Sequence, residues 1–344
     1  MSHIMEVDNF TNTEWENCAK EFADYSIYQT LPYQQVRGEM DNHKISRFIL
    51  KDQDSRVITM GQVRIKHVKL LGLKIGYIQW GPLFRRRNIK VEWPLNALKY
   101  LREYYLSNQV HVLRMVPNIY TNETAENCTE ILTAAGFRHI NIIKPYHTML
   151  FPLDIDEEEM RKLFHNKWRA SLRKAEKNKM VAYESRDVQF LYALEEMYRK
   201  SQERKRFKGL NIKEFIQAQE RLLISQKMNM IVVKKADDLL TIDVNSYLGD
   251  TAVGLFQAST ENGLSLGASY LAWWHTFLAA KRAGMKRYDM GGVDPQKNPS
   301  VYKYKSRMGA DEAFHIGCYD TYADKWAMRW FISMDYIYNV VKRR

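Results

Sequence analysis

Short apolar runs separated by polar or glycine-containing breaks dominate the first half of the chain, and this pattern predicts strands. Three runs rich in Ile, Val and aromatic residues come first, at residues 44–51, 56–66 and 74–80. Helical apolar spacing, with proline or glycine stops, then predicts helix, strand, helix and strand, at residues 91–106, 111–117, 124–135 and 137–143. The first half therefore predicts a strand-rich unit with two helices.

The same order recurs in the second half. Three strands, a long helix closed by Gly284 and two further strands are predicted at residues 230–235, 240–248, 251–257, 267–283, 286–290 and 313–319. A weak repeat can persist in element order after residue identity is lost. We therefore predict an α/β fold of two tandem units, each a mixed, mostly antiparallel sheet flanked by helices.

Domain boundaries follow from this duplication. We expect a first unit at residues 1–150, a second at 151–322 that begins with a basic helix, and a C-terminal aromatic helix at 323–344 that packs back on the core. The aromatic side chains of that helix are Trp326, Trp330, Phe331, Tyr336 and Tyr338. Such a stripe usually covers a core, and docking at a membrane interface is the alternative.

The basic helix is predicted over residues 160–179, after an acidic segment that suits its amino end. Its buried stripe is Phe164, Trp168, Leu172 and Ala175. The remaining surface carries an excess of one sign of charge, from Lys162, Lys167, Arg169, Arg173, Lys174 and Lys177. A solvated helix usually mixes both signs, so this face is either an anion-binding surface or an unusually basic solvated one.

Composition narrows the partners. The chain has 344 residues, of which 45% are hydrophobic, so it is long and apolar enough for two folded domains and is not disordered. Its 52 Lys and Arg against 40 Asp and Glu give a net charge of +12. That charge favours nucleic acid, phosphorylated sugar precursors or an anionic membrane face as a partner, or it serves solubility alone.

Cysteine and histidine usage argues against two kinds of site. The three cysteines are far apart and form no Cys-x-x-Cys pair, which favours a reducing cytoplasm over a disulfide framework. The nine histidines show no metal-ligand spacing, so no metal is expected. The chain shows no signal peptide or membrane-spanning run, and a cytoplasmic protein is predicted, with contact at the inner face of the membrane as an option.

One stretch near the C-terminus carries the candidate chemistry. Residues 287–295 predict a strand that runs into a Gly-Gly turn and stops at Asp294-Pro295. A short helical segment follows with Lys305 on it. This order would hold an ammonium group at the carboxyl end of a strand, where open α/β sheets keep their ligands.

Six short motifs follow one another along the chain: Gln29-Thr30-Leu31-Pro32-Tyr33 with Arg37, Gly76-Tyr77-Ile78-Gln79-Trp80-Gly81-Pro82, Lys167-Trp168-Arg169-Ala170-Ser171-Leu172-Arg173-Lys174-Ala175, Glu203-Arg204 with Phe207, Tyr288-Asp289-Met290-Gly291-Gly292, and Tyr304-Lys305-Ser306-Arg307-Met308-Gly309. They resemble, in the same order, motifs of the Fem family of aminoacyltransferases (FemA, FemB and FemX), and they span about residues 29–319. The resemblance implies two N-acetyltransferase-like units. It also implies transfer of an amino acid from aminoacyl-tRNA to the stem-peptide amine of a peptidoglycan precursor that is UDP-linked or lipid-linked.

The resemblance assigns roles to matching residues. Lys305 would be catalytic and supply positive charge to the oxyanion or to the tRNA terminus. Acceptor binding would fall to Arg37, Arg204, Tyr304 and Gly81, with the two arginines on the pyrophosphate. The tRNA backbone would contact Lys167, Arg169, Arg173 and Lys174. No cofactor is needed besides aminoacyl-tRNA as co-substrate. Ordinary surface lysine and salt-bridge roles are the alternatives, and Asp289 fits a turn partner better than a base.

Two observations keep other functions open. Val116 stands before Pro117 where the family often has an acidic residue, which argues against a carboxylate base there. An acyl-CoA-dependent N-acyltransferase that acts on an envelope or exopolysaccharide sugar would use the same fold. Gly267-Ala268 fits the pyrophosphate loop of such enzymes, but the loop's basic start and spaced glycines are missing. A non-catalytic RNA- or membrane-binding protein would need the basic helix but not Lys305.

Overall fold

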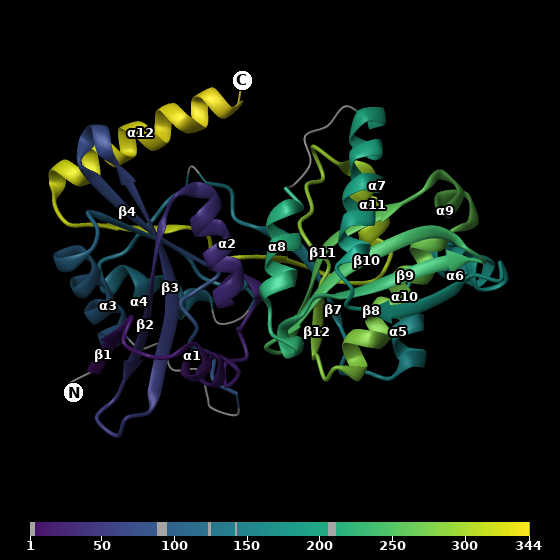
Figure 1. Cartoon of the computed structure of the whole chain (residues 1–344), viewed down its shortest axis with the longest axis horizontal. Helices are drawn as coiled ribbons and strands as arrows, with labels where there is room; N and C mark the ends of the chain where they lie inside the picture. Colours follow the sequence, from purple (N-terminus) through teal and green to yellow (C-terminus); the bar gives the residue numbers. More distant parts are fainter. Residues whose placement is uncertain (1–3, 88–94, 123–124, 142, 206–210, 344) are drawn as a thin grey trace. The chain divides into compact units, whose positions relative to one another are not determined.

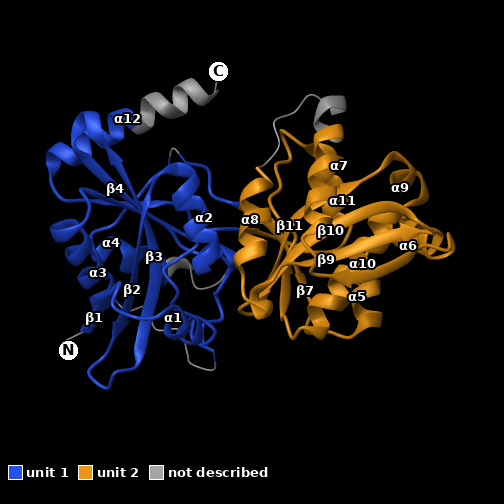
Figure 2. Ribbon diagram, in the orientation of Figure 1, with its two compact units in different colours: residues 1–146, 314–344 blue, residues 147–313 orange. Residues whose placement is uncertain are grey.

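The computed structural model divides the chain into two compact units (Figure 2). The first combines residues 1–146 with 314–344, and the second is the continuous segment 147–313. The structure describes residues 4–87, 95–122, 125–141, 143–205 and 211–343, with side chains left out at 125–126, 201–205 and 335–343. Residues 88–94, which include the start of the helix predicted at 91–106, and residues 206–210, which include Phe207 of the fourth motif, therefore lie outside the described part of the chain.

A seven-stranded sheet forms the core of the first unit (Figure 1). Its strands, in spatial order, are β1 (Ile4–Val7), β2 (Lys44–Lys51), β3 (Val57–Val68), β4 (Leu73–Gln79), β5 (Val112–Val116), β14 (Tyr319–Tyr322) and β6 (Arg138–His139). β4 and β5 run parallel and are joined by a crossover that contains helix α3 (Leu95–Asn108), and the other neighbours are antiparallel.

Helices flank this sheet and bury one apolar stripe each. They are α1 (Asn12–Ala19), α2 (Leu31–Asp41), α3 (Leu95–Asn108), α4 (Ala125–Ala134) and α12 (Lys325–Arg343), with short 3₁₀ turns η1 (Ile27–Gln29) and η2 (Lys69–Leu71). Thr11 and Glu14 form a capping box that fixes the start of α1. Leu98, Leu101 and Tyr105 of α3 are fully buried against the sheet, as their spacing predicted.

The second unit is built on another seven-stranded sheet. Its spatial order is β13 (Asp311–Phe314), β7 (His147–Pro152), β12 (Arg287–Asp289), β11 (Thr251–Ser259), β10 (Asp238–Leu248), β9 (Asn229–Lys235) and β8 (Val181–Ser185). β11 and β12 are parallel, and helices α9 (Glu261–Leu266) and α10 (Ala268–Arg282) connect them. The order of three antiparallel strands, helical crossover and parallel strand matches the first unit, so the predicted duplication of a mixed α/β unit is confirmed.

Long apolar faces hold the second unit together. Its helices are α5 (Glu157–Leu163), α6 (Asn166–Glu176), α7 (Gln189–Lys205), α8 (Lys213–Arg221), α9 (Glu261–Leu266), α10 (Ala268–Arg282) and α11 (Pro299–Ser306), with a 3₁₀ turn η3 (Ile224–Gln226). Phe277 of α10 stacks on Phe151 of β7 at 4.2 Å between ring centroids. Trp168 of α6 and Phe164 join the same core.

Three sequence-based predictions need correction. The basic helix is not continuous, because Phe164 has extended backbone angles and separates α5 from α6. The boundary at residue 150 is wrong, since β7 pairs with β12 in the second sheet. The second boundary is wrong as well, because β14 inserts between β5 and β6 of the first sheet. The chain thus returns to the first unit after Ala313, and the second unit is an insertion into it.

The C-terminal helix also belongs to the first unit. Ala327 and Phe331 of α12 are buried against Leu73 of β4 and Val112 of β5. The helix therefore covers the first sheet through Ala327 and Phe331, and it is not a third body. Of the predicted aromatic stripe, Trp326 and Trp330 are exposed, and the side chains of Tyr336 and Tyr338 lie outside the described residues.

Candidate functional site

The predicted strand and Gly-Gly turn around residue 290 form a tight corner in the second unit. β12 ends at Asp289, whose buried carboxylate accepts the amide N–H of Gly291 at 2.8 Å and the hydroxyl of Thr148. Gly291 has φ of +78°, and a Cβ there would lie 2.8 Å from the carbonyl oxygen of Gly254 on β11. The corner therefore requires glycine for both its backbone angle and its close approach to β11.

Lys305 reaches this corner from α11. Its Nζ donates to the carbonyl oxygen of Gly291 at 3.1 Å and to that of Gly292 at 3.3 Å. Burial lowers the pKa of Lys305 to about 8, against the opposing effect of Asp289 and then Asp243. The ammonium group does lie beyond the carboxyl end of a strand, as the sequence indicated. Its catalytic role stays a prediction.

A buried aspartate that the sequence analysis missed belongs to the same unit. Asp243 of β10 is 2% exposed, and its Oδ2 accepts a 2.5 Å hydrogen bond from Thr276 of α10. Asn245 donates to the same oxygen at 3.4 Å and accepts from the hydroxyl of Tyr288. Burial raises the pKa of Asp243 to about 7, and the charge of Lys305 opposes this rise. Polar residues alternating on one face of an otherwise apolar strand were the available signal.

Tyr304, which was predicted to bind the acceptor, packs its ring against two other aromatic side chains. Its ring lies 5.3 Å from that of Tyr270 in an edge-on contact and 6.5 Å from that of Trp168. Burial raises the pKa of its phenol. Successive residues of a helix project about 100° apart, so Tyr304 faces the core while Lys305 faces the Gly-Gly corner. In this structure Tyr304 supports α11 against α6 and α10.

The basic surface predicted from the sequence is present on α6. Lys167, Arg173 and Lys174 are exposed. Arg169 differs, because its guanidinium donates to the carbonyl oxygen of Lys162 at 3.2 Å and to the side chain of Asn166. Three of the four predicted phosphate ligands therefore present their charge to solvent, whereas Arg169 joins the end of α5 to α6.

The early glutamine motif and the Gly-Pro motif meet in the first unit. The Nε2 of Gln29 donates to the carbonyl oxygen of Gln79 at 2.6 Å, and the side chain of Gln62 donates to the carbonyl of Gln29 at 2.6 Å. Gly81 begins a cis peptide bond to Pro82, and a Cβ on Gly81 would lie 3.0 Å from the Gln29 side chain. Gly81 therefore shapes the end of β4 through its contact with Gln29.

Two arginines lie near this end of the first unit. Arg37 of α2 pairs with Asp41 at 2.6 Å on the helix surface. Arg64 of β3, which the sequence analysis missed, is only 7% exposed and donates to the amide oxygens of Gln34 and Gln79 at 3.2 and 2.9 Å. Burial lowers the pKa of its guanidinium. An arginine inside the apolar run of β3 was the signal for it.

The predicted site that would combine arginines of the two motifs with Lys305 stays a prediction. The side chain of Arg204 lies outside the described residues. Arg37 belongs to the first unit and Lys305 to the second.

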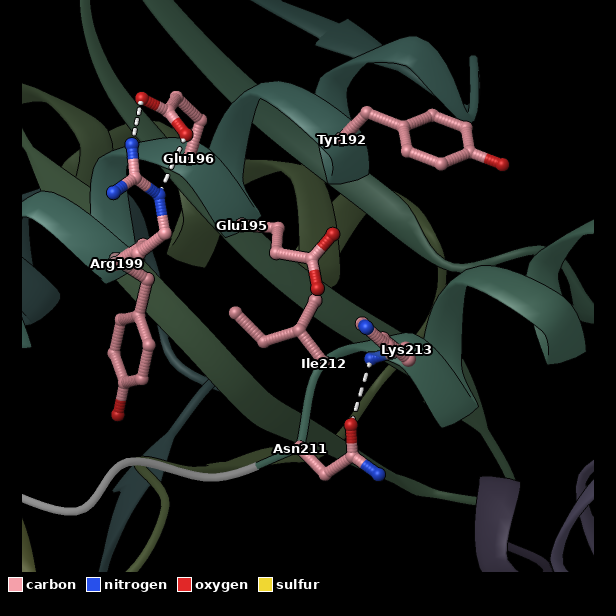
Figure 3. Close-up of a pocket in the computed structure, with 8 residues that line it drawn as sticks. Tyr192, Glu195, Glu196, Arg199, Asn211, Ile212 and Lys213 are labelled. Carbon is pink, nitrogen blue, oxygen red and sulfur yellow. Dashed lines mark hydrogen bonds and ion pairs between the residues drawn. The ribbon is translucent and has the colours of Figure 1, made fainter. Parts of the chain in front are cut away.

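One cavity of about 430 Å³ lies between α7 and the start of α8, in the second unit (Figure 3). Glu196 and Arg199 pair on one wall at 2.7 Å, while the Lys213 amide donates to the Asn211 side chain at 3.3 Å on the other. Among the predicted site residues whose side chains the structure describes, none lines this cavity. Among the described residues, no cluster of three acidic, His or Cys side chains could hold a metal ion, and no helix is long and apolar enough to span a bilayer.

The two units together define a protein built from a tandem pair of mixed α/β units. Over 92% of its length the chain is similar to the crystal structure of FemX, of which it covers 97%, with a TM-score of 0.78 and 18% identity. A conserved protein of unknown function from Bacteroides thetaiotaomicron matches with a TM-score of 0.59, 9% identity and coverage of 92% and 99%. The C-terminal domain of a putative lysylphosphatidylglycerol synthetase from Agrobacterium fabrum matches at 0.50, with 8% identity and coverage of 94% and 96%.

Part of the sequence matches a family model. A sequence model of the FemAB family matches residues 213–331, a segment that includes the Gly291 corner and Lys305. The predicted resemblance to the Fem family is thereby confirmed over this segment, which contains the last two of the six motifs. A search of curated proteins found no match.

Proposed function

We propose that this chain is an aminoacyltransferase of peptidoglycan synthesis. It takes an aminoacyl group from aminoacyl-tRNA and joins it to the stem-peptide amine of a UDP-linked or lipid-linked precursor. The observation that carries the proposal is the position of Lys305, a half-buried ammonium at the Gly291–Gly292 corner inside the segment that matches the FemAB family.

The chemistry requires a neutral amine and a stabilised oxyanion. The acceptor nitrogen attacks the ester carbonyl of the aminoacyl-tRNA, and negative charge develops on the carbonyl oxygen. The C–N bond forms, the ester C–O bond breaks, and the tRNA leaves with its ribose hydroxyl after the nitrogen gives up a proton. Lys305 would stabilise the developing charge from a site of low dielectric, where one ammonium acts more strongly than in water.

The other predicted residues have supporting roles in this proposal. Lys167, Arg173 and Lys174 offer an exposed basic surface for the tRNA backbone. Arg37, on the surface of α2, would offer its guanidinium group to the pyrophosphate of the acceptor. Arg204 would share that role. Gly81 would shape the acceptor site through Gln29.

An acyl-CoA donor is the second candidate, because N-acetyltransferase-like folds bind it at the loop before the crossover helix. In the second unit that loop is occupied by α9. The amides of Gly263 and Leu264 donate to Thr260, and the amide of Gly267 donates to Leu264, so these three N–H groups are used inside the loop. These three amides are thus not available to a pyrophosphate, which supports the tRNA donor.

A transfer assay tests the proposal. Purified protein is incubated with charged tRNA, or separately with acyl-CoA, and with soluble or lipid-linked muramyl peptides, and products are read by mass. We expect a mass gain of one amino-acid residue with charged tRNA, lost in Lys305→Met and kept in Lys303→Met, since Lys303 is exposed on the same helix. Acylation from acyl-CoA alone, or unchanged transfer by Lys305→Met, would refute it.

A further inference from the structure

An exposed surface of the first unit combines apolar tips with cations, and we call it the docking face. It consists of Lys69 and Leu70 in η2, and of Lys325, Trp326, Arg329, Trp330 and Ile332 on α12. None of these residues belongs to the six motifs or to the proposed transfer chemistry.

The core of the first unit holds the two parts of the docking face together (Figure 1). Ala327 and Phe331 anchor α12 on Leu73 and Val112. Val68, which precedes η2, and Leu71, its last residue, pack against the same cluster, so the turn between β3 and β4 lies beside α12. The guanidinium of Arg114 lies 4.8 Å from the ring centroid of Phe331 and adds to the anchor.

The outward side chains are unusually apolar for a free surface. Leu70 is 95% exposed, Trp326 49%, Trp330 45% and Ile332 47%. The two tryptophan rings lie 6.2 Å apart, one helical turn from each other. Isolated exposed apolar residues are common, but a tryptophan pair beside a fully exposed leucine forms a patch that usually has a binding partner.

The charged side chains of the patch itself are basic. Lys66, Lys69 and Lys74 are exposed near η2, and Lys325 and Arg329 are exposed on α12. Residues 66–74 and 325–334 contain no Asp or Glu. The nearby Asp324 is engaged at the start of α12, where it accepts the amide of Ala327 at 2.7 Å.

We propose that the docking face binds the surface of an anionic phospholipid bilayer. Tryptophan is suited to the boundary between acyl chains and headgroups, and lysine and arginine beside it would contact the anionic headgroups. Pairing of two copies through this face would bring like charges together, so charge complementarity favours the membrane over a second copy of the chain. The helix lies on the bilayer and does not cross it, in keeping with the absence of a spanning helix among the described residues.

Vesicle co-sedimentation of the full chain tests this inference. We expect binding to vesicles of phosphatidylcholine with about one-third phosphatidylglycerol, and little binding to phosphatidylcholine alone, because each basic residue near an anionic surface adds about 1 kcal/mol. Lys325→Glu with Arg329→Glu should reduce partitioning at least about tenfold. Trp326→Ala with Trp330→Ala should reduce it by about the same factor, through lost apolar contact.

Matched controls separate docking from general effects. Lys44→Glu with Lys99→Glu reverses two exposed lysines elsewhere on the first unit, and Ile224→Ala with Leu264→Ala removes exposed apolar side chains from the second. Both control variants should bind vesicles like the wild type. Thermal melts confirm that each variant is folded, and the charge-reversal and tryptophan variants should transfer normally to a water-soluble acceptor. Vesicle co-sedimentation needs no transfer activity, so failure of the docking inference and failure of the proposed function are distinguishable.

Three results would overturn the inference. These are equal binding to neutral and anionic vesicles, unchanged binding by both docking-face variants, or light scattering that shows a stable dimer broken by Trp326→Ala with Trp330→Ala.

Discussion

Replacement of Lys305 by methionine should make the second unit more stable at neutral pH while it abolishes transfer. The reason is the burial of a charged group. The pKa of Lys305 is lowered from 10.5 to about 8, which corresponds to about 3 kcal/mol at 1.36 kcal/mol per pH unit. The folded state therefore binds the Lys305 proton less tightly than the unfolded chain does. Methionine fills similar volume without that cost.

Lost hydrogen bonds reduce the gain. The carbonyl of Gly291 also lies 3.1 Å from the Thr148 hydroxyl, so it keeps a donor, whereas the carbonyl of Gly292 loses the Lys305 donor. That loss costs about 1 kcal/mol. Asp243 is not left as a buried charge at pH 7. Loss of the Lys305 cation raises the pKa of Asp243 from about 7, so its carboxyl group is protonated. The expected net gain for Lys305→Met is thus about 2 kcal/mol at pH 7.

The sign of the pH dependence distinguishes this reasoning from simple repacking. A lowered folded-state pKa means that the cost is fully present below about pH 8 and disappears as pH rises toward 10.5. Urea unfolding of the wild type and of Lys305→Met, at pH 7 and near pH 10, measures it. Lys303→Met serves as control and should change stability by less than about 0.5 kcal/mol. The reasoning fails if Lys305→Met is less stable than the wild type at pH 7, or if the difference is the same at both pH values.

Three further outcomes are expected. Transfer should fall as pH rises through about 8, where Lys305 loses its proton, and Lys305→Arg should move this alkaline limb upward if it keeps activity; a pH–rate profile checks both. Gly291→Ala should lower the free energy of unfolding, measured in urea, by about 2 to 4 kcal/mol, and Gly284→Ala by about 1 kcal/mol. Both glycines have positive φ, but only at Gly291 would the new Cβ meet a backbone oxygen. Lys167→Ala with Lys174→Ala should weaken tRNA binding and lower its salt slope by about 1.5, whereas Lys44→Ala with Lys99→Ala should leave a salt titration unchanged.

Local elements could be predicted from the sequence, but the non-local pairings could not. The spacing of Leu98, Leu101 and Tyr105 was sufficient to place the inner face of α3. By contrast, β7 and β14 are short strands whose partners lie far away in sequence, at residues 287–289 and 112–116. No local pattern specifies such a partner, so linear boundaries at 150 and 322 were the natural but wrong inference.

The candidate site shows the same division. Gly291 and Lys305 could be identified from the sequence, because a glycine pair predicts a turn and Lys305 lies in a motif that resembles one of the Fem family. Asp243 and Arg64 were missed because each lies in a strand whose apolar pattern predicts a buried core strand. Only the tertiary structure shows that Thr276 donates a hydrogen bond to Asp243 and that Arg64 donates one to Gln79. Burial by α10, which supplies Thr276, is what gives Asp243 its raised pKa.

Placement of β7 in the second sheet matters for the site as well as for the boundary. Thr148 lies on β7, and its hydroxyl is within hydrogen-bond distance of both the Asp289 carboxylate and the Gly291 carbonyl oxygen. Asp289 in turn fixes the amide of Gly291, whose carbonyl accepts from Lys305. A second unit that began at residue 151 would lack the strand that positions this corner. Thr148, Asp289, the Gly291–Gly292 turn and Lys305 all lie in the continuous segment 147–313. The hydrogen bonds that position the ammonium group of Lys305 are therefore formed within one unit.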